Sequence, residues 1–397
     1  MGKKIHIGLF ALLLAVPLLF AACGDDDDVT ISGPAAALPG ASLWVVPDNA
    51  VSDNIVTIFN AAPDNLYYNV HTSTNPAGQI RGQLDTSGQV RLAVLTGQQE
   101  VPPVNTPAFG AGALVVDNVA NQVRGFVKTS GLTGTPTAAH IHNGARGVPG
   151  PIILALTGGP DLWVVADNAV VDNVVAVFNA APDNLYFNVH TNLFPNGEIR
   201  GQLDNTGQVR IATLNGAQAD NASITALGIG MLLVDNSVVV SDNHVKGFIF
   251  ARGLTGTAAH IHNGARGTVG DNVVTLIGGP NLWIVPDRRT SGELVGIFNA
   301  APDNLYFNVH TAAHPAGEIR GQLDHNGTFL FTTLNGAQDN VSTSAFGAGV
   351  LSIDALTARI GGFILNSGLT GTPTAAHVHN AARGVSGPII LPLLPAP

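Results

Sequence analysis

The stretch LYFNVHTNLFPNGEIRGQL, which runs from Leu185 to Leu203, alternates apolar and polar residues on both sides of a turn. Successive side chains of a β-strand point to opposite faces, so Leu185, Phe187 and Val189 share one face of an extended segment. The Pro-Asn-Gly sequence at 195–197 supplies the turn, and the alternation resumes after it. The stretch therefore predicts a β-hairpin whose apolar side faces the core.

Two phrases recur along the chain with a period of about 120 residues. LYFNVHT returns at 305–311 and, as LYYNVHT, at 66–72, while AAHIHNGARG occupies 138–147 and 258–267 and returns as AAHVHNAARG at 375–384. The segments 95–213 and 214–333 contain both phrases, whereas 42–94 contains only the first and 334–397 only the second. This pattern predicts three equivalent domains of ordinary size, one of which is assembled from both chain ends.

The composition is dominated by short apolar runs separated by turn residues. Hydrophobic residues make up 45% of the chain and charged residues 11%, and 47 Gly and 24 Pro residues interrupt the apolar runs. Helical periodicity is not evident beyond residue 22. These features predict an all-β chain of tandem antiparallel β-sandwich domains. The formal net charge of −10 argues against nucleic acid as a partner.

Residues 1–22 are interpreted as a secretory signal, because two lysines precede an apolar run that ends in small residues. The sequence FAACG at 20–24 resembles a bacterial lipobox, which implies cleavage before Cys23 and lipidation of its sulfur. An ordinary secretory signal that contains a cysteine is the alternative. Residues 23–41 are acidic and then rich in Ala, Pro and Gly, which predicts a flexible tether. The expected location is the bacterial cell envelope, at the outer membrane or the cell surface.

Three phrases together resemble the CHRD domain, which is named after chordin and occurs in many bacterial secreted proteins. They are LTGQQEVPPV at 95–104, GLTGTPTAAHIHNGARGVPGPIILAL at 131–156 and the hairpin stretch at 185–203. The resemblance implies an immunoglobulin-like β-sandwich, an extracellular location and no established enzymatic activity. The segment Glu100 to Pro103 is missing from the other copies, so any role it has is expected in the unit 95–213 alone.

Nine of the 13 histidines lie in the repeated phrases and are the candidate metal ligands: His71, His140, His142, His190, His260, His262, His310, His377 and His379. A His-x-His pair on a strand places both imidazoles on one face, where a histidine of a neighbouring strand would complete a site for Cu or Zn. Pairing of the two chain ends would bring His71 near the pair at 377 and 379. Metal binding is expected to weaken below about pH 6, where imidazoles become protonated.

The alternative for these histidines is that they only form hydrogen bonds across strands or to loop carbonyls. They share the polar side of the hairpin with Tyr186, Asn188, Arg200 and Gln202, and this side is expected to be exposed. On it, Glu198 and Arg200 are expected to form a surface cross-strand pair.

These observations favour a lipid-anchored binding or structural module outside the cytoplasm. An unknown extracellular protein or a surface matrix is the expected partner, and the lipid on Cys23 would reach the membrane. A Cu- or Zn-binding protein, or a metal-dependent enzyme that uses the histidine clusters, is one alternative. A second alternative is a self-assembling surface protein whose terminal half-domains pair between molecules.

Overall fold

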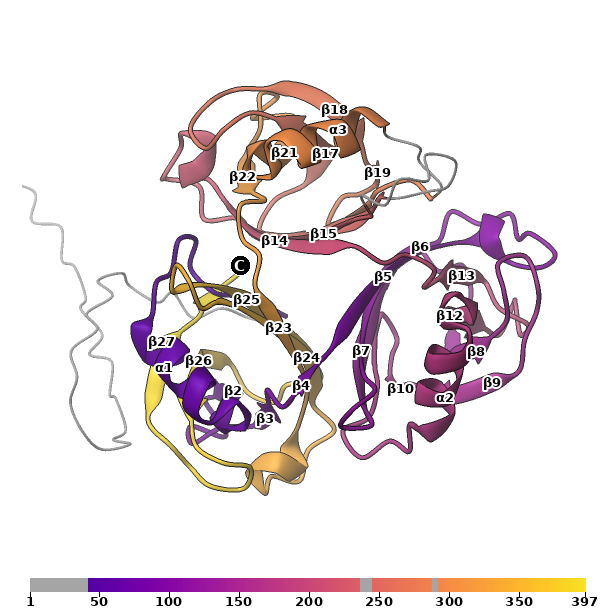
Figure 1. Ribbon diagram of the computed structural model, residues 1–397, viewed down its shortest axis with the longest axis horizontal. Helices are drawn as coiled ribbons and strands as arrows, with labels where there is room; N and C mark the ends of the chain where they lie inside the picture. The colour runs from indigo at the N-terminus through magenta and orange to yellow at the C-terminus, as the bar shows by residue number, and fades with distance from the viewer. Residues whose placement is uncertain (1–41, 236–244, 288–291) are drawn as a thin grey trace, which may run out of the picture. The chain divides into compact units, whose positions relative to one another are not determined.

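The computed structural model describes residues 42–235, 245–287 and 292–397, which all belong to one compact unit. The described chain folds into three antiparallel sheets and carries three short helices (Figure 1). This confirms the predicted all-β class. The signal segment 1–22, Cys23 and the tether 23–41 lie outside the described residues.

Two sheets are each built from one uninterrupted segment of the chain. In the first continuous sheet the strand order is β10 (Thr157–Gly158), β11 (Leu162–Val164), β7 (Gln122–Ser130), β6 (Phe109–Asp117), β5 (Gln89–Thr96), β13 (Ile199–Gln202), β12 (Leu185–Thr191), β8 (Pro136–Asn143) and β9 (Ile152–Ala155). In the second continuous sheet the order is β18 (Asp271–Thr275), β17 (Gly256–Asn263), β21 (Leu305–Thr311), β22 (Ile319–Gln322), β14 (Gln208–Asn215), β15 (Leu227–Val234), β16 (Val245–Arg252), β20 (Leu282–Ile284) and β19 (Ile277–Gly278). Each sheet curls until it is nearly closed (Figure 1).

The third sheet, called the terminal sheet below, combines strands from both ends of the chain. Its order is β27 (Ile389–Pro392), β26 (Pro373–Asn380), β2 (Leu66–Thr72), β3 (Ile80–Gln83), β23 (Thr328–Asn335), β24 (Phe346–Asp354), β25 (Arg359–Ser367), β1 (Leu43–Val45) and β28 (Leu394–Pro395), and β4 (Thr86–Ser87) pairs with β23. The long strands β5, β14 and β23 begin six residues before the expected unit starts at 95, 214 and 334. The strand pairing therefore places the sheet boundaries slightly earlier than the repeat phrases do.

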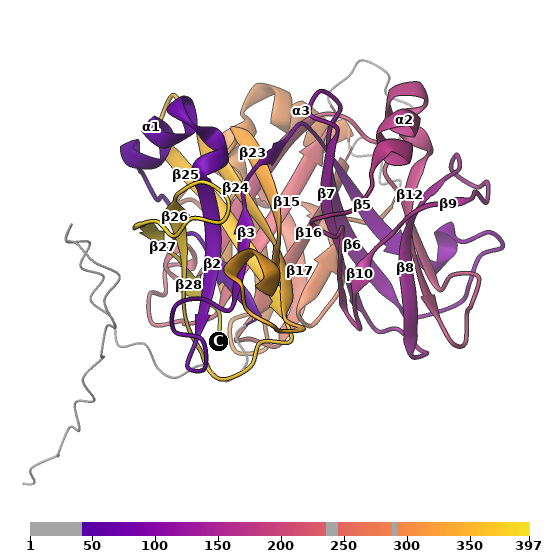
Figure 2. The same ribbon diagram turned by 90° about the horizontal axis from the view of Figure 1, so that it is seen from below.

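The three helices were not predicted from the sequence. They are α1 (Asp53–Ala61), α2 (Asp172–Ala180) and α3 (Gly292–Ala300), and each lies at one end of its own sheet (Figure 2). Helix α2 buries Val174 and Phe178, which are one turn apart, in the interior of the first continuous sheet. Nine residues provide too few turns for a clear periodic signal, which explains why no helical periodicity was evident in these segments. None of the helices in the described part of the chain has the length and apolar character that spanning a bilayer requires.

Each curled sheet encloses its own apolar core, as expected for an independent domain. A further core, which the sequence did not predict, lies on the outer faces of strands from all three sheets. In it the ring of Phe126 packs edge-to-face against Phe248 at 6.2 Å and against Phe363 at 5.9 Å, and all three side chains are buried. The three sheets are therefore joined by apolar burial as well as by the chain.

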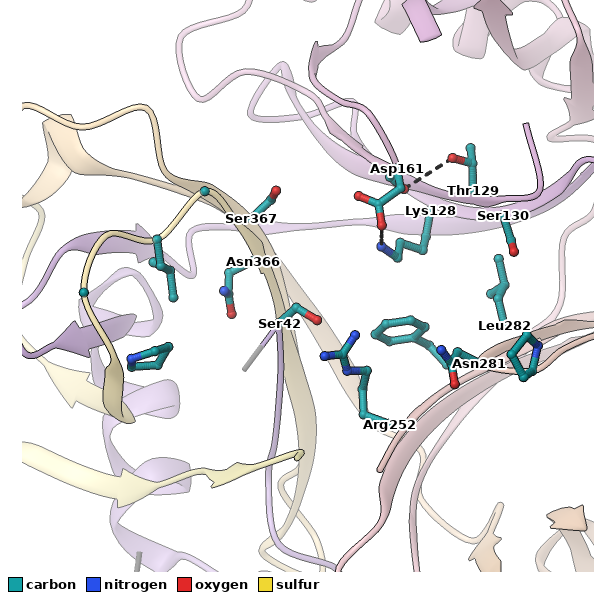
Figure 3. Close-up of a pocket in the computed structure, with 16 residues that line it drawn as sticks. Ser42, Lys128, Thr129, Ser130, Asp161, Arg252, Asn281, Leu282, Asn366 and Ser367 are labelled. Atoms are coloured by element: carbon teal, nitrogen blue, oxygen red, sulfur yellow. Dashed lines mark hydrogen bonds and ion pairs between the residues drawn. The ribbon is translucent and has the colours of Figure 1, made fainter. Parts of the chain in front are cut away.

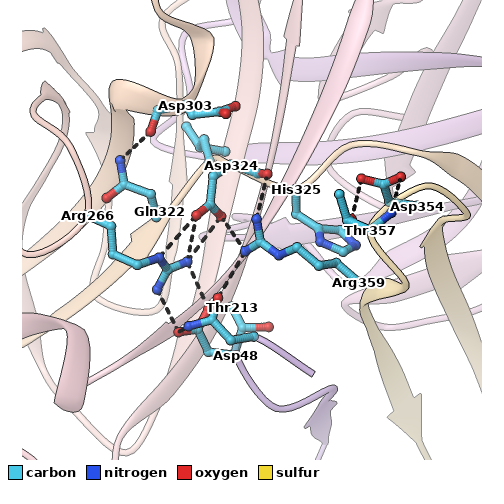
Figure 4. A network of polar contacts seen from close by, with 12 residues as sticks. Asp48, Thr213, Arg266, Asp303, Gln322, Asp324, His325, Asp354, Thr357 and Arg359 are labelled. Carbon is cyan, nitrogen blue, oxygen red and sulfur yellow. Dashed lines mark hydrogen bonds and ion pairs between the residues drawn. The ribbon is translucent and has the colours of Figure 1, made fainter. Parts of the chain in front are cut away.

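Ionic networks join the same three sheets. Figure 4 shows one of them, in which Arg266 of the second continuous sheet bonds Asp324 and also reaches Asp48 of the terminal sheet at 2.8 Å. Arg359 completes this network by pairing with Asp324 at 3.1 Å. The other two networks use equivalent positions: Arg146, Asp204, Lys246 and Asp287 in one, and Arg383, Asp85, Arg124 and Asp167 in the other.

Each network therefore pairs two cations with two carboxylates. Although burial alone would raise the pKa of Asp204, Lys246 and Arg146 hold it well below its usual value. The charged residues at these positions serve mainly to dock one sheet against the next.

Candidate metal centres

The three histidine triads lie on the outer faces of paired strands. In the first continuous sheet, β8 contributes His140 and His142, and the antiparallel neighbour β12 contributes His190. The register pairs His140 with Asn188 and His142 with Tyr186, so the three imidazoles share one face. Each triad brings its potential ligand atoms within 4.8 Å of one another, and the triads are His71, His377 and His379; His140, His142 and His190; and His260, His262 and His310. The nine sequence-predicted histidines are thus brought together three by three.

Backbone carbonyls orient two histidines of each triad. In the first continuous sheet, His142 Nδ1 lies 2.9 Å from the Gly150 carbonyl oxygen and His190 Nδ1 lies 3.1 Å from that of Pro195. A carbonyl oxygen can only accept, so each Nδ1 carries the hydrogen and each Nε2 keeps a free lone pair. The same arrangement occurs at His71, His262, His310 and His379. Such carbonyl contacts are the usual partners of metal-bound histidines.

The inward nitrogens of two triads have no hydrogen-bond partner. In the first continuous sheet, these buried atoms are Nε2 of His142, Nε2 of His190 and Nδ1 of His140. In the terminal sheet, they are Nε2 of His71, Nε2 of His379 and Nδ1 of His377. In the third triad, His260 Nδ1 lies 2.9 Å from His310 Nε2 and satisfies it. An unpaired buried polar atom costs about 1–3 kcal/mol, so three converging nitrogen atoms without partners are an unfavourable arrangement in the absence of a ligand.

A stack of rings fixes the triad from the side. The His142 ring stacks on Tyr186 with centroids 4.8 Å apart, and the Arg200 guanidinium lies 3.5 Å from the centroid of the Tyr186 ring. Arg200 also donates to the carbonyls of Ala145 and Val148, which holds the loop that supplies the Gly150 carbonyl. The equivalent stacks are His379, Tyr67 and Arg81, and His262, Tyr306 and Arg320. The ligand atoms are therefore held by a rigid shell.

Burial keeps the triads neutral. It lowers the pKa of His140 to about 4, with a further decrease from His190 and His142. The pKa of His260 is lowered to about 4 and that of His377 to about 3 for the same two reasons. Neutral imidazole is the form that binds a metal, so the triads are ready for coordination at neutral pH.

The expectation of an exposed polar face was wrong. Tyr186, Asn188, Glu198, Arg200 and Gln202 are all buried, because loops cover this side of the hairpin. Glu198 does not form a surface pair with Arg200; its carboxylate instead accepts hydrogen bonds from Thr106, Thr133 and Thr191. These bonds hold the pKa of Glu198 below its usual value despite the burial, which alone would raise it.

Two buried acids beside the triads were also missed. Burial raises the pKa of Glu100 to about 7, although Arg200 and a hydrogen bond from Asn188 lower it. In the terminal sheet Asp339 occupies the equivalent place beside Asn69 and Arg81, and burial raises its pKa to about 6. The Glu100 segment itself occurs only in the unit 95–213, and Asp339 supplies a second buried carboxyl at the equivalent position of the terminal sheet.

Comparison with protein families gives one match. The model of the CHRD domain matches residues 21–84, 92–203, 211–323 and 330–397. No curated protein and no solved structure matches the chain. The matched segments agree with the sheet boundaries, because the first three end near the link between one sheet and the next and the fourth runs to Pro397.

Proposed function

The chain belongs to the CHRD domain family, and we propose that within this family it is a binding module that holds copper or zinc ions in its three histidine triads. The observation that carries this proposal is the convergence of three buried nitrogen atoms without hydrogen-bond partners in each of two triads. Hydrogen bonding alone explains the outward Nδ1 atoms, which reach backbone carbonyls. It leaves the inward atoms without partners, and a metal ion would satisfy all three together.

The donor set favours a particular class of ion. Three neutral imidazoles suit Cu and Zn, whereas Ca²⁺ and Mg²⁺ prefer oxygen ligands. Three protein ligands leave a further coordination position for water or an external ligand. Copper is expected to bind more tightly than zinc, following the usual order of divalent metal affinities.

Metal uptake by the purified full-length protein tests the proposal. After chelator treatment, the protein should take up three Cu or Zn ions per chain, one for each triad. His140→Ala should reduce the uptake to two, because the remaining pair of histidines binds much more weakly. His314→Ala is the matched control, since His314 belongs to none of the triads and its loss should leave the uptake at three. Absence of uptake at neutral pH would leave only the hydrogen-bonding interpretation.

The triads also set the pH range of binding. The lowered pKa of His140, about 4, means that protons begin to compete only well below pH 6. We therefore expect half-release at about pH 4 to 5, lower than the sequence alone suggested. A titration monitored by metal analysis of the protein fraction checks this, and release already complete at pH 6 would contradict it.

We further propose that Cys23 carries lipid and that the module lies in the bacterial cell envelope, where it contacts an extracellular protein or matrix. The support is the resemblance of FAACG at 20–24 to a lipobox. Cys23→Ser should move the protein from the detergent phase to the aqueous phase, or leave an unprocessed precursor. Unchanged partitioning with normal processing would rule out lipidation.

We also propose that each curled sheet corresponds to the immunoglobulin-like sandwich expected for the family. The support is the single residue pair, Thr96 with Arg200, that joins β5 to β13 and could be the seam between two stacked sheets. A crystal structure with an extended ladder at this seam would contradict the idea.

The pairing of β2 with β26 inside one chain supports a closed monomer rather than the strand-exchange assembly. Light scattering should then give a monomer mass for the delipidated protein at all concentrations.

A further inference from the structure

A pocket of about 530 Å³ lies where strands of the three sheets meet, and the histidine triads do not contribute to it. Strand ends β7, β16 and β25 line it, together with the residues just before β11, β20 and β1. Figure 3 shows polar side chains from these strands around one space, with the Arg252 guanidinium pointing into it. The volume is in the usual range for a site that binds a small molecule.

At the pocket the three equivalent sheets differ in chemistry. The register pairs Leu162 with Lys128, Leu282 with Phe250 and Leu43 with Leu365, so these three pairs are equivalent. The leucine is retained in each pair, but its partner is a cation, an aromatic ring or an aliphatic chain. Two residues later the strands carry Ser130, Arg252 and Ser367, and the residues before the leucines are Asp161, Asn281 and Ser42. The pocket wall therefore carries different polar groups from each of the three sheets.

Arg252 has no ion-pair or hydrogen-bond partner among the described residues. Within residues 42–235, 245–287 and 292–397, every other arginine and lysine forms a hydrogen bond or ion pair: Arg81, Arg91, Arg124, Lys128, Arg146, Arg200, Arg210, Lys246, Arg266, Arg320, Arg359 and Arg383. Cations are few in this chain, and Arg252 alone among those described has no partner. A half-buried guanidinium without a partner therefore indicates an anionic ligand.

We propose that this pocket binds a uronic acid, a sugar whose carboxylate pairs with Arg252. The guanidinium offers a planar pair of donors that matches a carboxylate. Asp161 is held by Lys128 and keeps a carboxylate oxygen for a sugar hydroxyl, while the Asn281 amide can donate and accept. Pro280, which is exposed, and Leu369, which is half-buried, line the same pocket and provide apolar surface for the C–H face of the ring.

The charge balance of the wall supports this ligand class. On this wall Lys128 pairs with Asp161, which leaves the Arg252 guanidinium for the ligand. A neutral sugar would leave Arg252 unpaired. A doubly charged phosphate would bring an excess negative charge next to Asp161 and could not use the apolar surface.

Calorimetric titration of the full-length protein with galacturonate, galactose and inorganic phosphate tests the proposal. Galacturonate should bind, and galactose should bind at least tenfold more weakly because it lacks the carboxylate. Arg252→Ser installs the residue that both other sheets carry at this position, so the fold should tolerate it. This variant should lose at least tenfold in galacturonate affinity, while Arg252→Lys, which keeps the charge without the planar fork, should lose less.

The trimer of galacturonate distinguishes a free sugar from a polysaccharide end as the natural source, and binding of either supports the site. Equal affinity of Arg252→Ser and the original protein for galacturonate would overturn the proposal. So would galactose binding as tightly as galacturonate, or phosphate binding in place of both sugars. Because the nine triad histidines lie outside the pocket, metal uptake by Arg252→Ser should stay at three ions per chain whatever the sugar result.

Discussion

In the first continuous sheet the two strands that carry the histidine triad come from one segment of the chain, whereas in the terminal sheet they come from its opposite ends. The registers are nevertheless the same: Tyr186 pairs with His142, and Tyr67 pairs with His379. Even the register shift after the histidine of β12 recurs after His71 on β2. The pattern of side chains on each strand therefore specifies the pairing, and the chain connection between the strands does not.

The difference in connectivity has a small thermodynamic cost for a physical reason. Loop-closure entropy grows only with the logarithm of loop length, at about 0.6 kcal/mol per doubling. The two continuous sheets lie between the two ends in the chain. Once they have folded, the terminal strands are held closer together than in an unfolded chain, which raises their effective concentration. The terminal sheet then gains the same apolar interior as the others, with Trp44 and Tyr68 fully buried.

Removing one half of the terminal sheet should have the largest effect. Deletion of residues 334–397 takes away β24 to β28, and β2 then loses its neighbour β26. Residues 42–87 should unfold, because a strand with an exposed apolar face and open edges is not stable alone. Limited proteolysis with mass spectrometry should find cleavage in this segment and protection of 89–202 and 208–322. Protection of 42–87 in this deletion would mean that the two ends do not depend on each other.

The core that the three sheets share allows the sheets to be compared through the replacement of a single side chain. Phe363 of the terminal sheet and Phe126 of the first continuous sheet occupy equivalent places and pack ring against ring. Replacing either one by Ala should cost about 3–5 kcal/mol, because both leave a cavity in a closely packed centre. Urea unfolding followed by the fluorescence of Trp44, Trp163 and Trp283, one in each of the three sheets, should give equal losses of stability for the two variants. A much smaller cost for Phe363→Ala would show that the terminal sheet docks more loosely.

Repetition is what made the fold and the triads predictable. Alternation in the LYFNVHT phrases predicted the strands, and the divided repeat predicted which histidines would meet, including His71 with His377 and His379. The covering of the polar face was not predictable in this way. Whether Arg200 is exposed depends on the loop that supplies the Ala145 and Val148 carbonyls, which alternation along a strand cannot show.

The contacts between sheets were missed for a related reason. Strands such as β5 are apolar on both faces, with Leu92 and Val94 in the shared core and Ala93 and Leu95 in the inner core. A sequence that is apolar on both faces indicates burial but not the partner of each face. The ionic networks link residues far apart in the chain, as Arg266 and Asp48 do, and isolated charged residues give no pattern from which such a pair can be read.

The buried acids Glu100 and Asp339 should make the stability of the two sheets depend on pH in different ranges. Burial raises the pKa of Glu100 to about 7 from 4.5, so its ionised form is penalised in the folded state only. The stability that this group contributes is present below about pH 4.5 and is lost as the pH rises through 7. Glu100→Gln should therefore raise the free energy of unfolding at pH 8 by about 1–3 kcal/mol and change it little at pH 4.5.

Asp339→Asn is the matched variant in the terminal sheet. The pKa of Asp339 is raised to about 6 from 3.8, so its gain should already be complete near pH 7. Urea midpoints measured for both variants between pH 4 and 8 check the order of the two transitions. A gain for Glu100→Gln that is the same at pH 4.5 and pH 8 would show that the carboxyl does not titrate as its burial requires.

The smallest effect is expected from a circular permutation that gives the terminal sheet one continuous chain. The Ala396 amide donates to the Leu43 carbonyl at 2.9 Å, so a short linker can join Pro397 to Ser42. Opening the chain between Thr206 and Gly207, in the link from β13 to β14, then leaves all three sheets continuous. One covalent connection replaces another, so the free energy of unfolding should change by less than about 1 kcal/mol.

Refolding should be faster, because β2 and β26 become close in sequence. Stopped-flow refolding and urea unfolding of the permutant measure both quantities. A large loss of stability with unchanged refolding would show that the covalent link between the two continuous sheets, rather than the strand pattern, holds the molecule together.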